Sequence, residues 1–245
     1  MQAQSQVLDV WGDLAVFSRP ELKVERFSYP VITPSAARGI FDAIYCKPPE
    51  FRWQIDAIEI LSPPSYIALR RNEVKEKINL NAIFKWMAGT AQPEPIFADG
   101  DRDLTRSDEK GRTQRQTMAL KDVRYRLRAH IQPWPGHQNK LPGLEAQFRR
   151  RAAKGKCVWQ PYFGCREFPA FFELVEPQAP PAQPVAWDQD LGWMLYDVFD
   201  LSKPGTNHSP PRISLFQARV RGGVLQVPDF LSDQVAKVAE GGLHA

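Results

Sequence analysis

The stretch from Lys121 to Ile131 constrains the fold most, because apolar and polar residues alternate along it from Asp122 onward. The apolar positions are Val123, Tyr125, Leu127, Ala129 and Ile131, and the residues between them include Arg124, Arg126, Arg128 and His130. Side chains in a β-strand point alternately to the two faces of the sheet. The pattern therefore predicts one strand with an apolar face and a cationic face.

Strand and helix patterns follow one another along the rest of the chain. Residues 6–17 predict a buried strand with Gly12 as a bulge or close-approach point, and residues 51–57 a half-buried strand. Thr33-Pro34 begins a helix, because threonine caps a helix and proline suits its first turn. Further helices are expected at 80–87 and 141–154, further strands at 168–175 and 193–199, and a hairpin at Gly222-Gly223.

The order strand, helix, strand, then strand, helix, strand is the split βαβ pattern. It predicts an α+β fold with a ferredoxin-like or RRM-like domain over residues 1–175. The proline-rich residues 176–190 predict a linker, and residues 191–245 a small C-terminal β-sheet or hairpin part. Residues 92–116 are polar with prolines and glycines, which is typical of a long loop inside the first domain.

Several classes of function find no support in the sequence. The three cysteines (Cys46, Cys157 and Cys165) form no CxxC pair, so free thiols in a reducing cytoplasm are expected rather than disulfides or a zinc site. The chain has no phosphate-binding glycine motif, no HExxH and no GxSxG. It also has no apolar stretch long enough to span a bilayer. We therefore expect a cytoplasmic protein, monomeric in isolation, without a metal, cofactor or membrane partner.

Two cationic groups point to nucleic acid. Like charges aligned on the strand at 121–131 repel one another, which favours an anionic partner, although a solvated surface is the alternative. Residues 149–166 hold no acid, and they place aromatic residues among six cations, which are Arg149, Arg150, Arg151, Lys154, Lys156 and Arg166. A helix C-terminus attracts cations without any ligand. Cations that neutralise phosphates beside aromatic rings that accept bases nevertheless favour RNA, with DNA left open.

Specific motifs resemble a known family. They are WGDLAVF at 11–17, YP at 29–30, TPSAARGI at 33–40, IYCKP at 44–48, LKDVRY at 120–125, GKC at 155–157 and PYFGCREFPA at 161–170. Together they resemble the type I-C member of the fifth CRISPR-associated protein family, in the RAMP superfamily. The match runs in family order from about residue 6 to residue 175.

The resemblance implies a RAMP-type RRM-like domain with a smaller β-rich C-terminal part. It also implies metal-independent cutting of the CRISPR precursor transcript at the repeat hairpin, followed by retention on the 5′ handle with the other subunits of type I-C Cascade. Tyr45 matches the family's reactive tyrosine, and Arg38 joins the candidate RNA-binding residues. Alignment places Gly143-Leu144 at the family's Lys-His pair, so His137 and Lys140 are the nearest substitutes.

Three functions follow as alternatives. The first is a CRISPR-repeat endoribonuclease with Tyr45, His137 and Lys140 as the reaction centre. The second is a non-catalytic subunit that binds the guide RNA and neighbouring subunits. The third is a DNA-binding protein, because phosphate contacts do not read the sugar.

Overall fold

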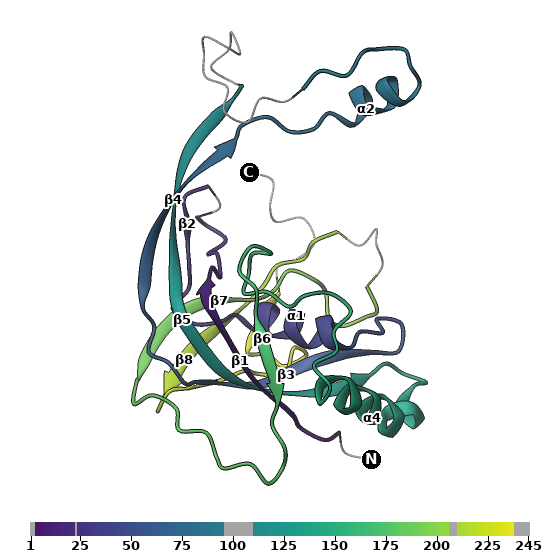
Figure 1. Ribbon diagram of the computed structural model, residues 1–245. Helices are drawn as coiled ribbons and strands as arrows, with labels where there is room; N and C mark the ends of the chain where they lie inside the picture. The colour runs from purple at the N-terminus through teal and green to yellow at the C-terminus, as the bar shows by residue number, and fades with distance from the viewer. Residues whose placement is uncertain (1–2, 23, 96–109, 206–209, 238–245) are drawn as a thin grey trace. The chain divides into compact units, whose positions relative to one another are not determined.

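The computed structural model describes residues 3–22, 24–95, 110–205 and 210–237. The chain divides into two compact units, of which one combines Met1–Ile67 with Met118–Ala245 and the other is Ala68–Thr117. The order of elements, most of which Figure 1 labels, is β1 (Gln6–Ala15), β2 (Arg26–Phe27), α1 (Pro34–Ile44), β3 (Phe51–Ile60), β4 (Tyr66–Val74), α2 (Leu80–Met87), β5 (Arg112–Pro133), η1 (Gln138–Lys140), α4 (Leu141–Ala152), β6 (Phe171–Leu174), β7 (Gln189–Asp197), β8 (Ser214–Arg221), β9 (Val224–Gln226) and β10 (Val235–Lys237).

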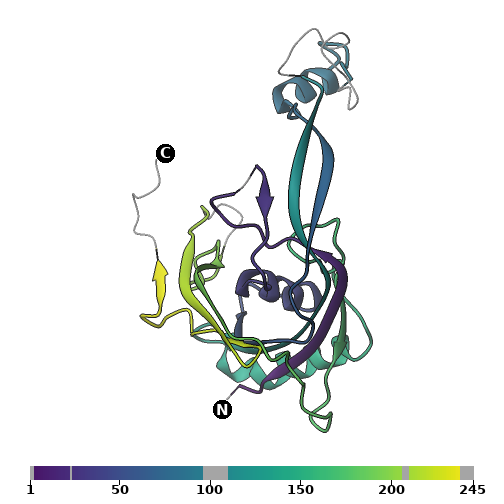
Figure 2. The same cartoon turned by 90° about the vertical axis from the view of Figure 1, so that its left-hand side faces the viewer.

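The strands of the described residues form one large antiparallel sheet in the order β10-β8-β9-β3-β5-β1-β6. Strands β2 and β4 also pair with β5, and β7 pairs with β8. Strand β5 lies between β1 and β3, where its alternating apolar residues are buried. Figure 2 shows strands of the first unit curving around α1. The α+β class and the strand at 121–131 are confirmed.

Helix α1 forms where Thr33 and Pro34 predict it. The Thr33 hydroxyl accepts a hydrogen bond from the Ala36 backbone N–H at 3.2 Å, which satisfies one of the free donors of the first turn. The buried stripe packs on β3 and α4, with ring centroids of Phe41 and Trp53 4.9 Å apart and those of Trp53 and Phe148 4.6 Å apart. This aromatic contact fixes the C-terminal ends of α1 and α4 relative to β3.

Strand β5 is longer than its sequence pattern indicated. It begins at Arg112, so the prediction of a loop over 92–116 is wrong for residues 112–116, and residues 96–109 lie outside the described part. In the unit Ala68–Thr117, β5 and β4 form a ribbon that also carries α2 (Figure 1). Both faces of this ribbon are largely exposed. Its sequence therefore lacks the alternation of apolar and polar residues that predicts a strand.

The C-terminal strands continue the main sheet. Gly222 and Gly223, with φ of +55° and +73°, turn β8 into β9 as predicted, and β9 pairs with β3. The expectation that β3 is half-buried is wrong, because the C-terminal residues cover its polar face and the Gln54 amide donates to the Tyr196 hydroxyl at 2.9 Å. Residues 176–190 run along the sheet, where the Val185 N–H donates to the Ile60 carbonyl at 2.9 Å. The predicted boundaries at 175 and 190 stay predictions.

Two glycines allow close approach of the segment 161–170 to the end of β1. A Cβ on Gly12 would lie 2.8 Å from the Pro169 carbonyl oxygen, which confirms the predicted close approach. Gly164 has φ of +79°, and a Cβ there would lie 1.9 Å from the Val16 carbonyl oxygen. This contact accompanies the hydrogen bond from the Val16 N–H to the Phe163 carbonyl at 3.1 Å.

We expect Gly164→Ala to lower the free energy of unfolding by at least about 2 kcal/mol, because the left-handed backbone and the collision with Val16 act together. Urea denaturation followed by tryptophan fluorescence measures the change. Gly39→Ala is the control, since Gly39 lies in α1 with open space around it, and alanine there should stabilise the protein by about 0.5–1 kcal/mol. An unchanged urea midpoint for Gly164→Ala would contradict the prediction.

Candidate active site

Tyr45 caps the C-terminal end of α1, and its ring lies in the core. The residue is 8% exposed, and its ring centroid lies 5.5 Å from that of Phe51. Its backbone N–H donates to the Phe41 carbonyl, and its carbonyl accepts from the Trp53 indole, both at 2.9 Å. Tyr45 and then the Glu50 carboxylate raise the pKa of Lys47 above its ordinary value.

Glu50 joins two lysines from different parts of the chain. One carboxylate oxygen lies 3.5 Å from the Lys47 ammonium, and the other lies 3.1 Å from the Lys140 ammonium. The hydrogen bond from Lys140 is the main cause that lowers the pKa of Glu50. Lys47, Glu50 and Lys140 thus form a chain of ion pairs that begins two residues after Tyr45, and these four residues are here called the tyrosine–lysine cluster.

Backbone hydrogen bonds hold the two halves of this cluster together. The register of β3 and β5 pairs Phe51 with Pro133, and the Trp134 N–H then donates to the Glu50 carbonyl at 2.9 Å. The Trp134 indole donates to the Pro48 carbonyl at 2.7 Å. His137 and Lys140 follow in a chain of turns, with each N–H donating to a carbonyl three residues earlier at 3.0 Å. The structure therefore brings the loop of His137 and Lys140 beside the segment of Tyr45.

His137 differs from its neighbours in this loop. Its ring nitrogen Nδ1 is buried, and no side chain or backbone group of the described residues is within hydrogen-bond distance. Buried polar atoms are nearly always paired, so an unpaired ring nitrogen beside a polar cluster is a candidate for contact with a substrate. The structure brings His137 to the same loop as Lys140.

The predicted basic segment lies against the same end of α1. The Arg151 guanidinium donates to the Ile44 carbonyl, and the Val158 N–H donates to the Ala43 carbonyl, both at 2.6 Å. Lys154 and Lys156 are exposed between these contacts, and within the described residues neither has an ion-pair partner. Trp159 is 44% exposed, so an aromatic ring is available beside the cations.

The remaining cations of this segment are used in different ways. Arg149 pairs with the Glu176 carboxylate at 2.9 Å, and Arg150 donates a hydrogen bond to the Gln147 side chain. Arg166 is exposed, and no carboxylate of the described part of the chain pairs with it. The absence of acids from residues 149–166 therefore left the partner of Arg149 undetected, because that partner comes ten residues after the segment ends.

The structure changes the interpretation of the cationic face of β5, because carboxylates neutralise most of its charges. Arg126 binds Asp9 through two hydrogen bonds of 2.7 and 3.0 Å, and Arg128 binds Glu59. Asp56 accepts a hydrogen bond at 2.8 Å from His130 and raises the pKa of that imidazole. The repulsion that favoured an external anionic partner is offset within the protein for these three residues, because β1 and β3 supply the acids from distant positions. Among the described residues, only Arg124 of the three arginines is exposed without a carboxylate partner.

Arg38 was predicted to bind RNA, but its side chain is largely buried and binds two acids of the protein. Its guanidinium binds the two oxygens of Asp197 at 2.8 and 3.2 Å and Asp42 at 2.5 Å. Burial opposes its charge, but Asp197 and Asp42 raise its pKa on balance. We therefore remove Arg38 from the candidate RNA-binding residues.

The three cysteines are free, as predicted. No three His, Cys, Asp or Glu side chains within the described ranges gather closely enough to hold a metal ion. None of the helices there combines the length and apolar character needed to cross a bilayer.

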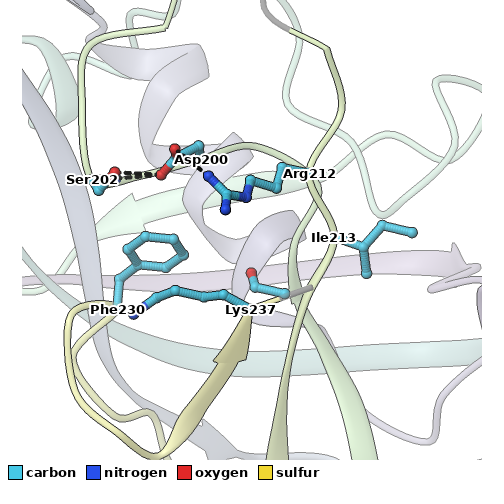
Figure 3. A pocket seen from close by; sticks show the side chains of 7 residues that line it. Asp200, Ser202, Arg212, Ile213, Phe230 and Lys237 are labelled. Carbon is cyan, nitrogen blue, oxygen red and sulfur yellow. Dashed lines mark hydrogen bonds and ion pairs between the residues drawn. The ribbon is translucent and has the colours of Figure 1, made fainter. Parts of the chain in front are cut away.

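A small cavity of about 70 Å³ lies in the C-terminal part (Figure 3). Its Asp200 carboxylate accepts hydrogen bonds from the N–H and hydroxyl of Ser202 at 3.0 and 2.6 Å and from Arg212 at 3.3 Å. The Lys237 ammonium lies 5.0 Å from the Phe230 ring centroid. None of the predicted site residues lines this cavity, so the tyrosine–lysine cluster is the better candidate.

The fold places the chain in the class of α+β proteins with a large antiparallel sheet. A solved structure titled "Crystal Structure of CRISPR-associated Protein" superposes with a TM-score of 0.62 at 18% identity, covering 96% of this chain and 97% of that one. A functionally uncharacterised protein from Streptococcus mutans superposes with a TM-score of 0.59, at the same identity and coverage. These similarities establish the fold.

The family follows from the sequence comparisons. The model of the Cas5d family, described as "CRISPR-associated protein (Cas_Cas5)", matches residues 7–228, and the chain belongs to this family. It is 39% identical over 236 residues to the CRISPR pre-crRNA endoribonuclease Cas5d of Mannheimia succiniciproducens, covering 94% of this chain and 97% of the relative. It is 37% identical over 244 residues to the protein of the same name from Thermus thermophilus, covering 95% of each.

Proposed function

We propose that this chain is an endoribonuclease that cuts the precursor of CRISPR RNA within the repeat. The observation that carries the proposal is the near full-length similarity to two relatives named as pre-crRNA endoribonucleases. The tyrosine–lysine cluster supports it, because Tyr45 and Lys140, which are 95 positions apart in the sequence, meet through Lys47 and Glu50 beside a basic segment.

The reaction needs no group beyond those of the RNA and the protein. The 2′-hydroxyl loses its proton to a base and attacks the adjacent phosphorus, and the bond from phosphorus to the 5′-oxygen breaks. The leaving oxygen takes a proton from an acid, so the products are a 2′,3′-cyclic phosphate and a 5′-hydroxyl. Negative charge develops on the phosphate oxygens in the transition state, where nearby cations stabilise it.

The cluster supplies a group for each of these tasks. The Tyr45 hydroxyl orients the reacting group, and the ammonium groups of Lys47 and Lys140 stabilise the charge on the phosphate. His137 exchanges the proton, since an imidazole can both donate and accept one and its Nδ1 has no partner among the described residues. The RNA backbone binds to the cations around the cluster, which are Arg149, Arg150, Arg151, Lys154, Lys156 and Arg166, with Arg124 as a separate contact on β5.

The fold fits this assignment at the level of the superfamily. The strands β3, β5, β1 and β6 lie side by side in that order, with α1 after β1 and α4 after β5, as in a ferredoxin-like domain. We therefore assign a RAMP-type RRM-like domain with a β-rich C-terminal part. The same proposal places the protein in the cytoplasm as a monomer in isolation, and on the 5′ handle with the other type I-C Cascade subunits after cutting.

Incubation of the protein with its cognate repeat RNA in EDTA tests the proposal. We expect one cut within the repeat and a 5′ fragment that ends in a cyclic phosphate. Tight binding of RNA that stays intact would instead favour the non-catalytic Cascade subunit. Competition with duplex DNA at matched salt tests the third alternative, and RNA is expected to bind more tightly.

The paired change Lys154→Ala and Lys156→Ala tests the basic segment. Each lysine that neutralises one phosphate of a single strand contributes about 0.7 to the slope of log K against log salt, so the slope should fall by about 1 to 2 in magnitude. Fluorescence anisotropy with labelled repeat RNA at several salt concentrations measures it. Lys203→Ala is the control, because Lys203 is an exposed lysine in the C-terminal part. An unchanged slope would exclude both lysines from the interface.

A further inference from the structure

Glu50 is fixed more firmly than an exposed acid usually is. Its backbone N–H donates to the Lys47 carbonyl at 2.9 Å, and its carbonyl accepts from the Trp134 N–H at 2.9 Å. The side chain is only 22% exposed, and its two oxygens bind two different ammonium groups. The backbone therefore sets the direction of the carboxylate, and the carboxylate sets the positions of Lys47 and Lys140.

Two ammonium groups do not gather at one place without an anion between them. Lysine side chains are long and strongly hydrated, and about half of the surface of Lys47 and of Lys140 is exposed. Without Glu50 their mutual repulsion and their freedom of rotation would separate them. With Glu50 the three groups carry a net charge of +1, which matches the single negative charge of a phosphodiester.

We propose that Glu50 is a positioning residue that holds the ammonium groups of Lys47 and Lys140 beside the Tyr45 hydroxyl for the phosphate that is cut. The inference rests on the proposed function and deepens it. Lys47, which lies in the family motif at 44–48 but has no role from the resemblance, becomes a catalytic residue, because Glu50 holds its ammonium two residues from Tyr45. Glu50 acts only through the two lysines and does not touch the RNA.

If Glu50 had a purely structural role, Glu50→Gln would lose stability rather than catalytic rate. Exposed ion pairs contribute little to stability, and the backbone hydrogen bonds of residue 50 do not depend on its side chain. Glu50→Gln should therefore fold with the thermal midpoint of the wild type. Its effect should appear in the rate of the chemical step, because a loss of alignment at the reacting atoms slows chemistry more than it weakens binding.

Single-turnover cutting of repeat RNA by Glu50→Gln tests the inference. We expect the rate at saturating protein to fall by about 10- to 100-fold, while the Kd for a repeat RNA with a 2′-deoxy group at the cut changes less than about twofold. Glu50→Asp, which keeps the charge, should recover part of the rate. Glu21→Gln is the matched control, because Glu21 is an exposed acid in an ion pair with Arg19 outside the cluster.

The dependence of the rate on pH gives a second measurement. Tyr45 and Glu50 raise the pKa of Lys47, so removing the Glu50 charge lowers that pKa and the ammonium is lost at a lower pH. The alkaline limb of the profile for Glu50→Gln should therefore move to lower pH. Lys47→Met should also slow cutting strongly in the wild type and much less in Glu50→Gln, because the two residues act as one unit.

The outcomes separate this inference from the proposed function. If the wild type does not cut repeat RNA, the proposed function fails. If the wild type cuts and Glu50→Gln cuts at the same rate with the same pH profile, the positioning role is overturned and the proposed function stands. A variant that binds RNA more weakly but reacts at the wild-type rate once saturated also overturns it, since Glu50 would then act in binding.

Discussion

Tyr45→Phe should cut repeat RNA at least about 100-fold more slowly than the wild type while binding it equally well. The variant removes one oxygen, which is the only polar group of the Tyr45 side chain. A side chain that orients or exchanges a proton at the reacting atoms contributes about 10²- to 10⁴-fold to the rate. Phenylalanine keeps the ring contact with Phe51, at a centroid distance of 5.5 Å in the wild type, so the fold should be retained.

Single-turnover kinetics and anisotropy with uncleavable repeat RNA separate the two effects. Tyr66→Phe is the control, because it also removes one hydroxyl, which donates to the Ser28 carbonyl at 3.2 Å outside the cluster. The control should cut at the wild-type rate. If Tyr45→Phe also does so, Tyr45 is a core residue only, and the reaction centre has to be sought around His137 and Lys140 alone.

Local patterns in the sequence predicted the elements that bury an apolar face. Helix α1 begins at its threonine cap, and the strand at 121–131 is buried on the face that the alternation indicated. The ribbon formed by β4 and the first part of β5 was not predicted. Residues 112–116 are all polar, and they pack on no core. The burial of β3 on both faces escaped too, because its cover comes from residues near Tyr196 and Phe230, more than 140 positions away.

The candidate site also combines residues that local patterns predicted with residues whose roles depend on distant parts of the chain. Tyr45, His137 and Lys140 could be named from the family motif and the basic loop, but Glu50 and Lys47 could not. The ion pair between Glu50 and Lys140 depends on the register that places Phe51 opposite Pro133, and no local pattern specifies this register. The ion pairs of the β5 arginines were not predicted, for a related reason. An alternating strand shows which residues share a face, whereas their partners Asp9 and Glu59 are set by the neighbouring strands.

Asp197→Asn should lower the free energy of unfolding by about 1.5–3 kcal/mol, because it weakens the charged hydrogen bonds to Arg38 while Asp42 still binds the guanidinium. Asp197 is 1% exposed and accepts hydrogen bonds from Arg38 of α1 as well as from the backbone N–H groups of Val198 and Phe199. Asparagine has nearly the same shape, so the loss comes from the charge rather than from a cavity. Urea denaturation followed by circular dichroism measures it.

Asp190→Asn is the matched control on the same strand. Asp190 forms an exposed ion pair with Arg219 at 3.1 Å, and such pairs contribute about 0–1 kcal/mol. The triple variant Arg38→Met, Asp42→Asn and Asp197→Asn should be more stable than Asp197→Asn alone, because it removes the buried charges together and leaves none of them with too few partners. If the triple variant is instead less stable, the cost of losing Asp197 lies in its bonds to Val198 and Phe199, and Arg38 does not tie α1 to β7 through its charge.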